Sequence, residues 1–330
     1  MIKMKRRFEI TRYISLFAVV ILIIIGTFLS DRFLQVQNVM NILQYASETG
    51  LVSIGMTFVI LSGGIDLSVG SVMGIGNITG AMMISAGNPV WLAVVTAIAF
   101  GAGIGLVNGL LITKTKLEPF IVTLVTMTCA RSVVYFMSNG APIIRHISDG
   151  YKSISQNTLG IIPYPVIYML LAYLIAYYIL KNSVYGRHLY AIGGSLETAL
   201  LFGIRADAIR ISVYIISGAL AGFAGIISSS RLGMGDPNSG LGYEMAAITI
   251  VVVGGASMAG GSGSIFGTFF GMMLLSILKN LLQLNNVISY IQPVIEGTII
   301  ILVSLLFARE IMRDKIYGKK EALKIGSKGK

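Results

Sequence analysis

The chain has 330 residues, of which 55% are hydrophobic and only 12% are charged, with a mean hydropathy of +0.82. A soluble globular domain carries about 25% charged residues to solvate its surface, so this composition excludes an ordinary soluble protein and favours one that is solvated by lipid. The net charge of +11 would suit a nucleic-acid-binding protein, unless the basic residues are placed for another purpose.

Ten apolar runs follow one another along the chain, each near the length of about 20 residues that a transmembrane helix needs. The runs are continuously apolar and do not alternate, which favours helices over barrel strands. We therefore expect an all-α membrane protein, a polytopic bundle of about ten transmembrane helices with broken or re-entrant segments. The expected spans are 14–30, 42–62, 67–86, 91–112, 120–138, 163–181, 211–230, 243–260, 264–282 and 289–308.

Lysine and arginine are enriched in the cytoplasmic loops of membrane proteins, so their distribution predicts the orientation. With the N-terminus inside, the cytoplasmic segments hold 19 of these residues and the opposite loops hold four. Both termini are therefore expected in the cytoplasm, and topology explains the positive charge without nucleic acid. The first span has no clear cleavage site after it and is expected to remain as an anchor. The expected parts are a basic N-terminus (1–13), a transmembrane domain (14–308) and a basic cytoplasmic tail (309–330).

Many of the 39 glycines are spaced four residues apart. Such rows let helix backbones approach closely, which is how helices associate in lipid. We interpret them as packing positions in a compact bundle and not as a ligand site. The rows are Gly101, Gly105 and Gly109; Gly218 and Gly222; and Gly263, Gly267 and Gly271.

Two further glycine clusters interrupt apolar runs, at 62–71 and 254–264. Each predicts a helix end, a tight turn and a newly capped helix. Non-helical backbone at membrane depth is tolerated where it is buried in protein or lines a cavity, so the breaks indicate either a pathway or simple turns at the inner face. The candidate caps are Asp66 or Ser68 in the first cluster and Ser262 or Ser264 in the second, and the candidate pathway residues are Gly63, Gly64, Asp66, Ser68, Gly254 and Gly255.

Ionisable residues within the spans are candidates for function, because their burial in lipid is costly. Asp66 lies in the first break, where it is either a helix cap or part of a site. Arg131 is expected to form a structural ion pair with Glu48 or Glu296, since all three fall in the outer halves of their spans. So few buried charges argue against a proton- or sodium-driven carrier, and the energy is expected from elsewhere. The lone Cys129 provides no metal site, and no cofactor is expected.

The longest cytoplasmic loop, 182–210, carries a short amphipathic pattern. Ser195 can cap a helix that runs to about Phe202 and ends at Gly203. Apolar side chains repeat there at spacings of three and four, which predicts a stripe that packs against a partner protein or the membrane face. The stripe consists of Leu196, Ala199, Leu200 and Ile204.

Three motifs in this order resemble the ribose-type permeases of ABC importers, over about residues 40–308. The first is Gly63-Gly64-Ile65-Asp66-Leu67-Ser68-Val69-Gly70-Ser71, the second runs from Gly186-Arg187 through Ala191-Ile192-Gly193-Gly194-Ser195 to Gly203-Ile204, and the third is Val253-Gly254-Gly255-Ala256-Ser257-Met258-Ala259-Gly260-Gly261-Ser262-Gly263-Ser264 with Gly267-Thr268. The departures are small: Ser195 stands where Asn is usual, and Leu200 where Ala is common.

The resemblance implies a permease subunit of the bacterial cytoplasmic membrane that performs no covalent chemistry and is not an enzyme. Such permeases pair with a second copy or a homologue, bind a cytoplasmic ATPase at the coupling loop, and receive a monosaccharide from an extracytoplasmic solute-binding protein. The sequence itself contains no G-x-x-x-x-G-K-[ST] phosphate-binding loop, which agrees with a separate ATPase. The residues expected to dock the ATPase are Glu197, Leu200, Gly203 and Ile204.

Other functions remain open at this point. One alternative is an ion-coupled secondary transporter, which would take up its solute without any ATPase. Another is an ABC permease for branched-chain amino acids, nucleosides or a sugar-like signal molecule. A membrane-embedded enzyme is disfavoured, because no span carries a cluster of His, Asp or Glu residues.

Overall fold

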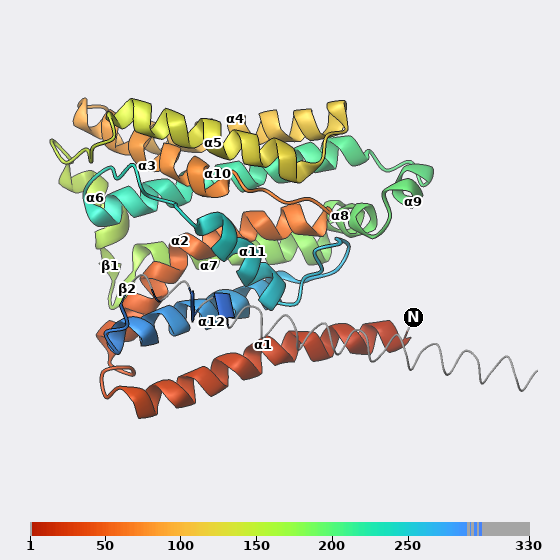
Figure 1. The fold of residues 1–330 in the computed structure, drawn as a ribbon, viewed down its shortest axis with the longest axis horizontal. Helices are drawn as coiled ribbons and strands as arrows, with labels where there is room; N and C mark the ends of the chain where they lie inside the picture. Colours follow the sequence, from red (N-terminus) through yellow and green to blue (C-terminus); the bar gives the residue numbers. More distant parts are fainter. Residues whose placement is uncertain (1, 289–290, 292–293, 296, 299–330) are drawn as a thin grey trace, which may run out of the picture.

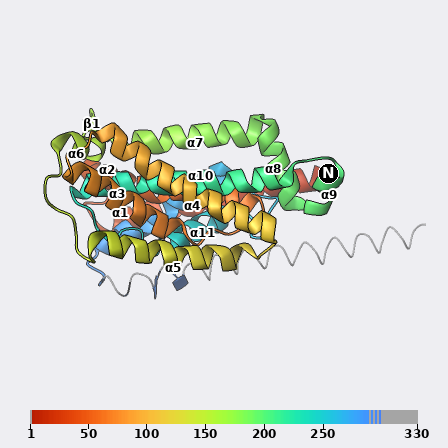
Figure 2. The ribbon, with the colours of Figure 1, turned by 90° about the horizontal axis from the view of Figure 1, so that it is seen from above.

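Long helices that run roughly along one direction make up most of the computed structural model, which describes residues 2–288, 291, 294, 295, 297 and 298 (Figures 1 and 2). The helices are α1 (Ile2–Leu29), α2 (Val36–Leu61), α3 (Val69–Ser85), α4 (Val90–Thr115), α5 (Pro119–Ser138), α6 (Asp149–Gln156), α7 (Tyr164–Asn182), α8 (Val184–Gly194), α9 (Leu196–Leu201), α10 (Ala206–Leu232), α11 (Tyr243–Val253) and α12 (Ile265–Leu284). Strands β1 (Thr158–Leu159) and β2 (Ile162–Pro163) form a small antiparallel hairpin.

Nine of the ten expected spans each coincide with one helix, and the expectation of an all-α membrane protein is confirmed at this level. Within the described residues, five helices are long and apolar enough to cross a membrane, namely α4, α5, α7, α10 and α12. The span expected at 243–260 is wrong at its end, because α11 stops at Val253. The expected span 289–308, apart from a few residues, and the whole tail 309–330 lie outside the described residues.

Helix α2 lies at the centre of the bundle, where it packs against α7, α10, α11 and α12. Its side chains are buried almost continuously from Ala46 to Leu61. Buried hydroxyl groups on this helix donate within the protein: Thr57 Oγ1 lies 2.7 Å from the Ser53 carbonyl oxygen and 2.9 Å from Thr268 Oγ1. Because neighbouring helices surround α2, it tolerates more polar residues than a helix that faces lipid.

Most glycines of the expected rows pack helix backbones against each other. Gly263 does not, because it lies in the second break before α12, with φ +149°. Along α4 and α10, Gly101 lies against the backbone of Gly218, and Gly105 against the backbone of Tyr214. Between α11 and α12, Gly254 and Gly267 are in the same kind of backbone contact. A side chain at any of these positions would overlap the neighbouring backbone, so glycine is required by the close approach of the helices.

The two ends of the bundle carry different elements. Figures 1 and 2 show α8 and α9 at the end where α1 begins, and α6 with the β1–β2 hairpin at the opposite end. The loop 182–210 therefore lies on the same side of the molecule as the N-terminus, which is the arrangement that the charge distribution predicts.

The close approach of α4 to α10 makes a matched prediction. A Cβ atom at Gly105 would overlap the carbonyl oxygen of Tyr214, whereas one at Gly103, on the same helix, has nothing within 4 Å. We expect Gly105→Ala to destabilise the protein by about 1–3 kcal/mol through overpacking, and Gly103→Ala to leave it unchanged or slightly more stable. Thermal unfolding in detergent measures both, and equal melting temperatures for the two variants would contradict this packing.

Candidate functional site

The first break, between α2 and α3, is organised by the carboxylate of Asp66, which is 1% exposed. Its Oδ1 accepts hydrogen bonds from the backbone N–H of Ser68 (3.0 Å) and from the Ser68 hydroxyl (2.6 Å), and its Oδ2 accepts one from the Ser217 hydroxyl on α10 (2.9 Å). The network continues because Asn108 Nδ2 on α4 donates to Ser68 Oγ (3.0 Å) and Thr126 on α5 donates to Asn108 Oδ1 (2.6 Å). Asp66 thus holds the start of α3 to three other helices.

These bonds favour the capping role of Asp66 over a solute contact, because the carboxylate is occupied by protein donors. Ser68 occupies the N-cap position of α3, but its hydroxyl bonds to Asp66 and not to the helix backbone. In the second break the cap is Ser264, whose Oγ accepts from the N–H of Gly267 at 3.0 Å, and this resolves the alternative with Ser262.

The two breaks expected from the sequence meet each other at α8. The N–H of Gly261 donates to the carbonyl oxygen of Leu61, the last residue of α2, at 3.0 Å. Gly193 of α8 lies against the same backbone atoms so closely that a Cβ there would overlap them. Gly63 takes a left-handed conformation (φ +82°), as does Gly255 (φ +89°), so both turns need glycine. The remaining candidates also have backbone roles, since Gly64 packs against the Tyr214 hydroxyl and Gly254 against Gly267.

A third break, 233–242, lies between the expected spans 211–230 and 243–260. Figure 1 shows this segment running from the end of α10 back into the middle of the bundle, where α11 begins. Helix α11 has only 11 residues and is therefore about 16 Å long, which is half the thickness of the hydrocarbon core. The run Gly233-Met234-Gly235-Asp236-Pro237-Asn238-Ser239-Gly240-Leu241-Gly242 is rich in residues that break helices, and this signal could have found it.

Arg131 of α5 supplies hydrogen bonds to this unwound segment. Its Nη1 donates to the carbonyl oxygens of Pro237 and Ser239, both at 2.9 Å, and its Nη2 donates to the carbonyl oxygen of Gly70 at 3.0 Å. Unwound backbone leaves carbonyl groups without helical partners, and a guanidinium with five N–H groups can satisfy several of them at once. Arg131 therefore joins the segment 233–242 to the first turn of α3.

The expected ion pair between Arg131 and Glu48 is wrong. Glu48 is 1% exposed and pairs with Arg231 at the end of α10, whose Nε lies 2.7 Å from Glu48 Oε1. Tyr243, the first residue of α11, donates to Glu48 Oε2 at 3.0 Å, and the Arg231 guanidinium stacks 4.5 Å from the ring centre of Tyr45. Arg131 does not pair with Glu48 because its guanidinium donates its hydrogen bonds to backbone carbonyl oxygens. The other expected partner, Glu296, lies outside the described residues.

The loop 182–210 contains the expected short helix. Ser195 caps α9 by accepting from the N–H of Thr198 at 3.2 Å, and Gly203 follows the helix with φ +74°. The preceding helix α8 was not expected. The exposed side differs from the expected stripe: Ala199 is 2% exposed and Ile204 packs against the core, whereas Leu201 and Phe202 are 88% and 82% exposed. Glu197, Leu200 and Gly203 are exposed as expected.

The exposed apolar surface of α9 therefore consists of Leu196, Leu200, Leu201 and Phe202, and we call it the α9 patch. It lies at the end of the bundle that carries the N-terminus (Figure 2). Leu201 ends the helix and Phe202 follows it directly, so two adjacent large apolar side chains are exposed there. Such a surface suits contact with a partner protein or with the membrane face.

Comparison with known proteins identifies the family of this chain. Residues 38–304 match the family model of the branched-chain amino acid transport system permease component. The chain belongs to this permease family. Among curated relatives, a ribose import permease protein of Escherichia coli (strain K12) is 40% identical over 297 residues, which cover 88% of this chain and 92% of the relative.

Two further relatives give the range of the similarity. A ribose import permease protein of Bacillus subtilis (strain 168) is 40% identical, with 87% of this chain and 89% of the relative covered. A D-allose transport system permease protein of Escherichia coli (strain K12) is 34% identical, with 86% of each chain covered. No solved structure matches the chain.

The Asp66 network predicts a difference between two substitutions. Asp66→Asn keeps an oxygen that accepts from Ser68, whereas Asp66→Ala leaves the Ser68 and Ser217 donors buried without an acceptor. We expect Asp66→Ala to lower the free energy of unfolding by about 1–3 kcal/mol and Asp66→Asn to lower it by clearly less. The two variants are compared by thermal unfolding in detergent, and a capping role is ruled out if alanine proves as stable as asparagine.

The Glu48–Arg231 pair is suited to a double-mutant cycle. Arg231→Gln leaves Glu48 as a buried charge without its partner and is expected to cost about 3–5 kcal/mol. Adding Glu48→Gln removes that charge, so the double variant is expected to be more stable than Arg231→Gln alone. Arg32→Gln, which changes an exposed arginine, is the control. A double variant that loses the sum of the two single losses would show that the pair has no coupling.

Proposed function

We propose that this chain is the membrane-embedded permease subunit of an ATP-driven importer for a monosaccharide, ribose or a similar sugar. The similarity to ribose import permeases over nearly the whole of both chains supports the substrate class. The observation that carries the ATP-driven mechanism is the α9 patch, an exposed apolar surface on a chain that has no phosphate-binding loop of its own. An ATPase partner that docks on α9 would supply the energy.

In this proposal the protein crosses the bacterial cytoplasmic membrane ten times, with both termini, the tail 309–330 and the coupling loop 182–210 in the cytoplasm. The domain boundaries are those expected from the sequence, with the transmembrane domain at 14–308. The common position of α1's start and of α8–α9 supports this orientation (Figure 1). A second permease copy or a homologue completes the pathway, and an extracytoplasmic binding protein delivers the sugar.

Movement of the docked ATPase would reach the membrane interior through α8. Gly193 touches the end of α2 and the loop 254–264 through backbone atoms, so there is no flexible side chain in this contact to absorb a displacement. From there the first break leads to Asp66 and Ser68, and Gly70 of the same helix start is bonded to Arg131. We propose that Gly63, Gly64, Asp66, Ser68, Gly254 and Gly255 shape the pathway by forming these joints, and that Glu197, Leu200, Gly203 and Ile204 form or support the docking surface.

No covalent step is required of this subunit. Alternating access needs the bundle to expose a sugar first to one side and then to the other, and the three breaks are the places where helices can change direction. The protein hydroxyl and amide groups that contact a sugar have no fixed spacing in a sequence. Uptake measurements with different sugars therefore identify the substrate. Import of a branched-chain amino acid, a nucleoside or a sugar-like signal molecule by the same mechanism is the alternative.

The docking surface gives the decisive prediction. We expect Leu201→Ser combined with Phe202→Ser to abolish co-purification of the ATPase and to reduce ATP-dependent ribose uptake by at least about tenfold, since truncating a hot-spot residue at the centre of an interface costs about 2 kcal/mol or more. Melting temperature should not change, because both side chains are exposed.

The matched control is Leu159→Ser combined with Ile161→Ser, at the opposite end of the bundle, where both side chains are 65% exposed. This variant should keep the ATPase bound. Uptake that continues in liposomes without any ATPase would instead establish an ion-coupled carrier, and normal co-purification of the Leu201/Phe202 variant would refute docking at α9.

A further inference from the structure

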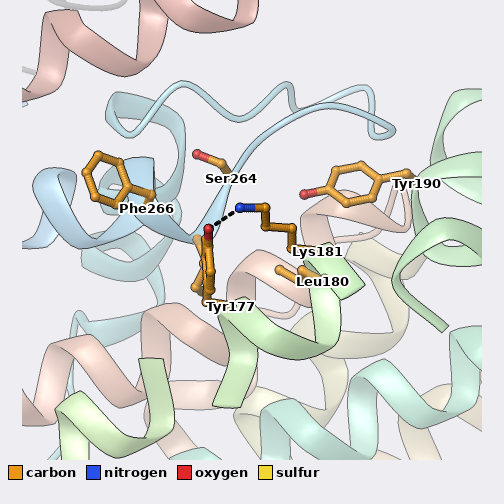
Figure 3. Close-up of a pocket in the computed structure, with 7 residues that line it drawn as sticks. Tyr177, Leu180, Lys181, Tyr190, Ser264 and Phe266 are labelled. Carbon is orange, nitrogen blue, oxygen red and sulfur yellow. Dashed lines mark hydrogen bonds between the residues drawn. The ribbon is translucent and has the colours of Figure 1, made fainter. Parts of the chain in front are cut away.

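A cavity of about 270 Å³ lies where the ends of α7 and α8 meet the start of α12. It borders the second break, whose last residue Ser264 is part of its lining, and it shares no residue with the α9 patch. Figure 3 shows the Lys181 ammonium and the Tyr177 hydroxyl turned toward one another, with the Tyr190 hydroxyl pointing toward Lys181 and Ser264 beside them. The lining residues are Tyr177, Leu180, Lys181, Tyr190, Ser264, Ile265 and Phe266, and we call this the Lys181 cavity.

The Lys181 cavity offers hydrogen-bond donors and a positive charge. Lys181 Nζ donates to the Tyr177 hydroxyl at 2.5 Å, which leaves other ammonium hydrogens and the hydroxyl hydrogen of Tyr177 for a ligand. Ser264 Oγ accepts from the N–H of Gly267, so its own hydrogen also remains to be donated. None of the seven lining residues is acidic. A ligand with several acceptor oxygens and a negative charge fits this set.

The position of the cavity on α7 indicates where that ligand comes from. Leu170 and Leu174 are 42% and 64% exposed on a helix that is long and apolar enough to cross a membrane, so they face lipid. Tyr177 and Lys181 continue the same face at spacings of three and four residues, toward the helix end. Tyrosine and lysine at that depth lie at the level of the lipid headgroups.

We propose that the Lys181 cavity binds the phosphate group of an anionic phospholipid. The Lys181 ammonium and the hydroxyls of Tyr177 and Ser264 donate to its oxygens, while the acyl chains lie along the exposed leucines of α7. The orientation given under the proposed function would place this lipid in the cytoplasmic leaflet. The binding site itself does not rest on the proposed function.

The site has a consequence for the helices around it. The Tyr190 hydroxyl on α8 donates to the carbonyl oxygen of Gly263 at 2.9 Å, directly before Ser264 and α12. A headgroup in the cavity therefore touches α7, α8 and α12 at their junction. Because the lipid binds this folded arrangement, it should stabilise it in proportion to its occupancy.

The test uses the purified full chain in detergent, titrated with phosphatidylglycerol or with phosphatidylcholine of the same acyl chains. We expect phosphatidylglycerol to raise the melting temperature more than phosphatidylcholine, and one phosphatidylglycerol to stay bound in native mass spectrometry. Lys181→Gln should weaken this binding by about tenfold or more, as expected for the loss of a charge-assisted hydrogen bond. Lys181→Arg, which keeps the charge, should retain most of it.

Lys116→Gln is the matched control, because it removes an exposed lysine at the end of α4 that does not line the cavity. It should leave lipid binding unchanged, and Tyr177→Phe should weaken binding without removing the charge. If inorganic phosphate at millimolar concentration protects the chain as well as phosphatidylglycerol does, the source is a soluble anion and the lipid assignment is overturned. Equal binding of the two lipids, or unchanged binding by both Lys181→Gln and Tyr177→Phe, would overturn the site. None of these measurements requires transport, so their outcome is independent of the proposed function.

Discussion

Irregular backbone inside the membrane must find its hydrogen bonds within the protein, and this constraint determines much of the structure. The segment 233–242 is held by Arg131, and the first break is held by Asp66 and its hydroxyl partners. Both sets of bonds end on the first turn of α3, through Gly70 and Ser68. The buried polar residues therefore act as joints between helices that change direction, and α3 is the element that these joints share.

Local features of this chain could be predicted from the sequence. The capped helix at Ser195, most of the packed glycines and the helices at nine expected spans depend on residues that are close together along the chain, so patterns of three, four or twenty residues reveal them. Membership of the permease family was also visible in three motifs. From these features the sequence predicts the fold class and the side of the molecule on which a partner protein would dock.

The residues that each polar or apolar side chain contacts could not be predicted in the same way. Arg131 was expected to bind a carboxylate, because charge is visible in a sequence, but it binds neutral carbonyl groups that every residue possesses. Arg231 is one of the four basic residues that the sequence places in the loops opposite the N-terminus, although it forms the ion pair with Glu48. Similarly, α9 was expected to show Ala199 and Ile204 on its exposed side, whereas packing on the core turns both of them inward. Such choices depend on which helices become neighbours.

The Glu48–Arg231 pair also bears on how the protein is made. Glu48 is synthesised 183 residues before Arg231, which corresponds to about 10–40 s of translation. Throughout that interval α2, which is not among the helices long and apolar enough to cross a membrane, has neither its cation nor the surrounding helices α10 and α12. Its stable position in the bilayer is therefore reached only when the second half of the chain has been inserted, so that biogenesis is completed by the late helices and does not proceed simply in chain order.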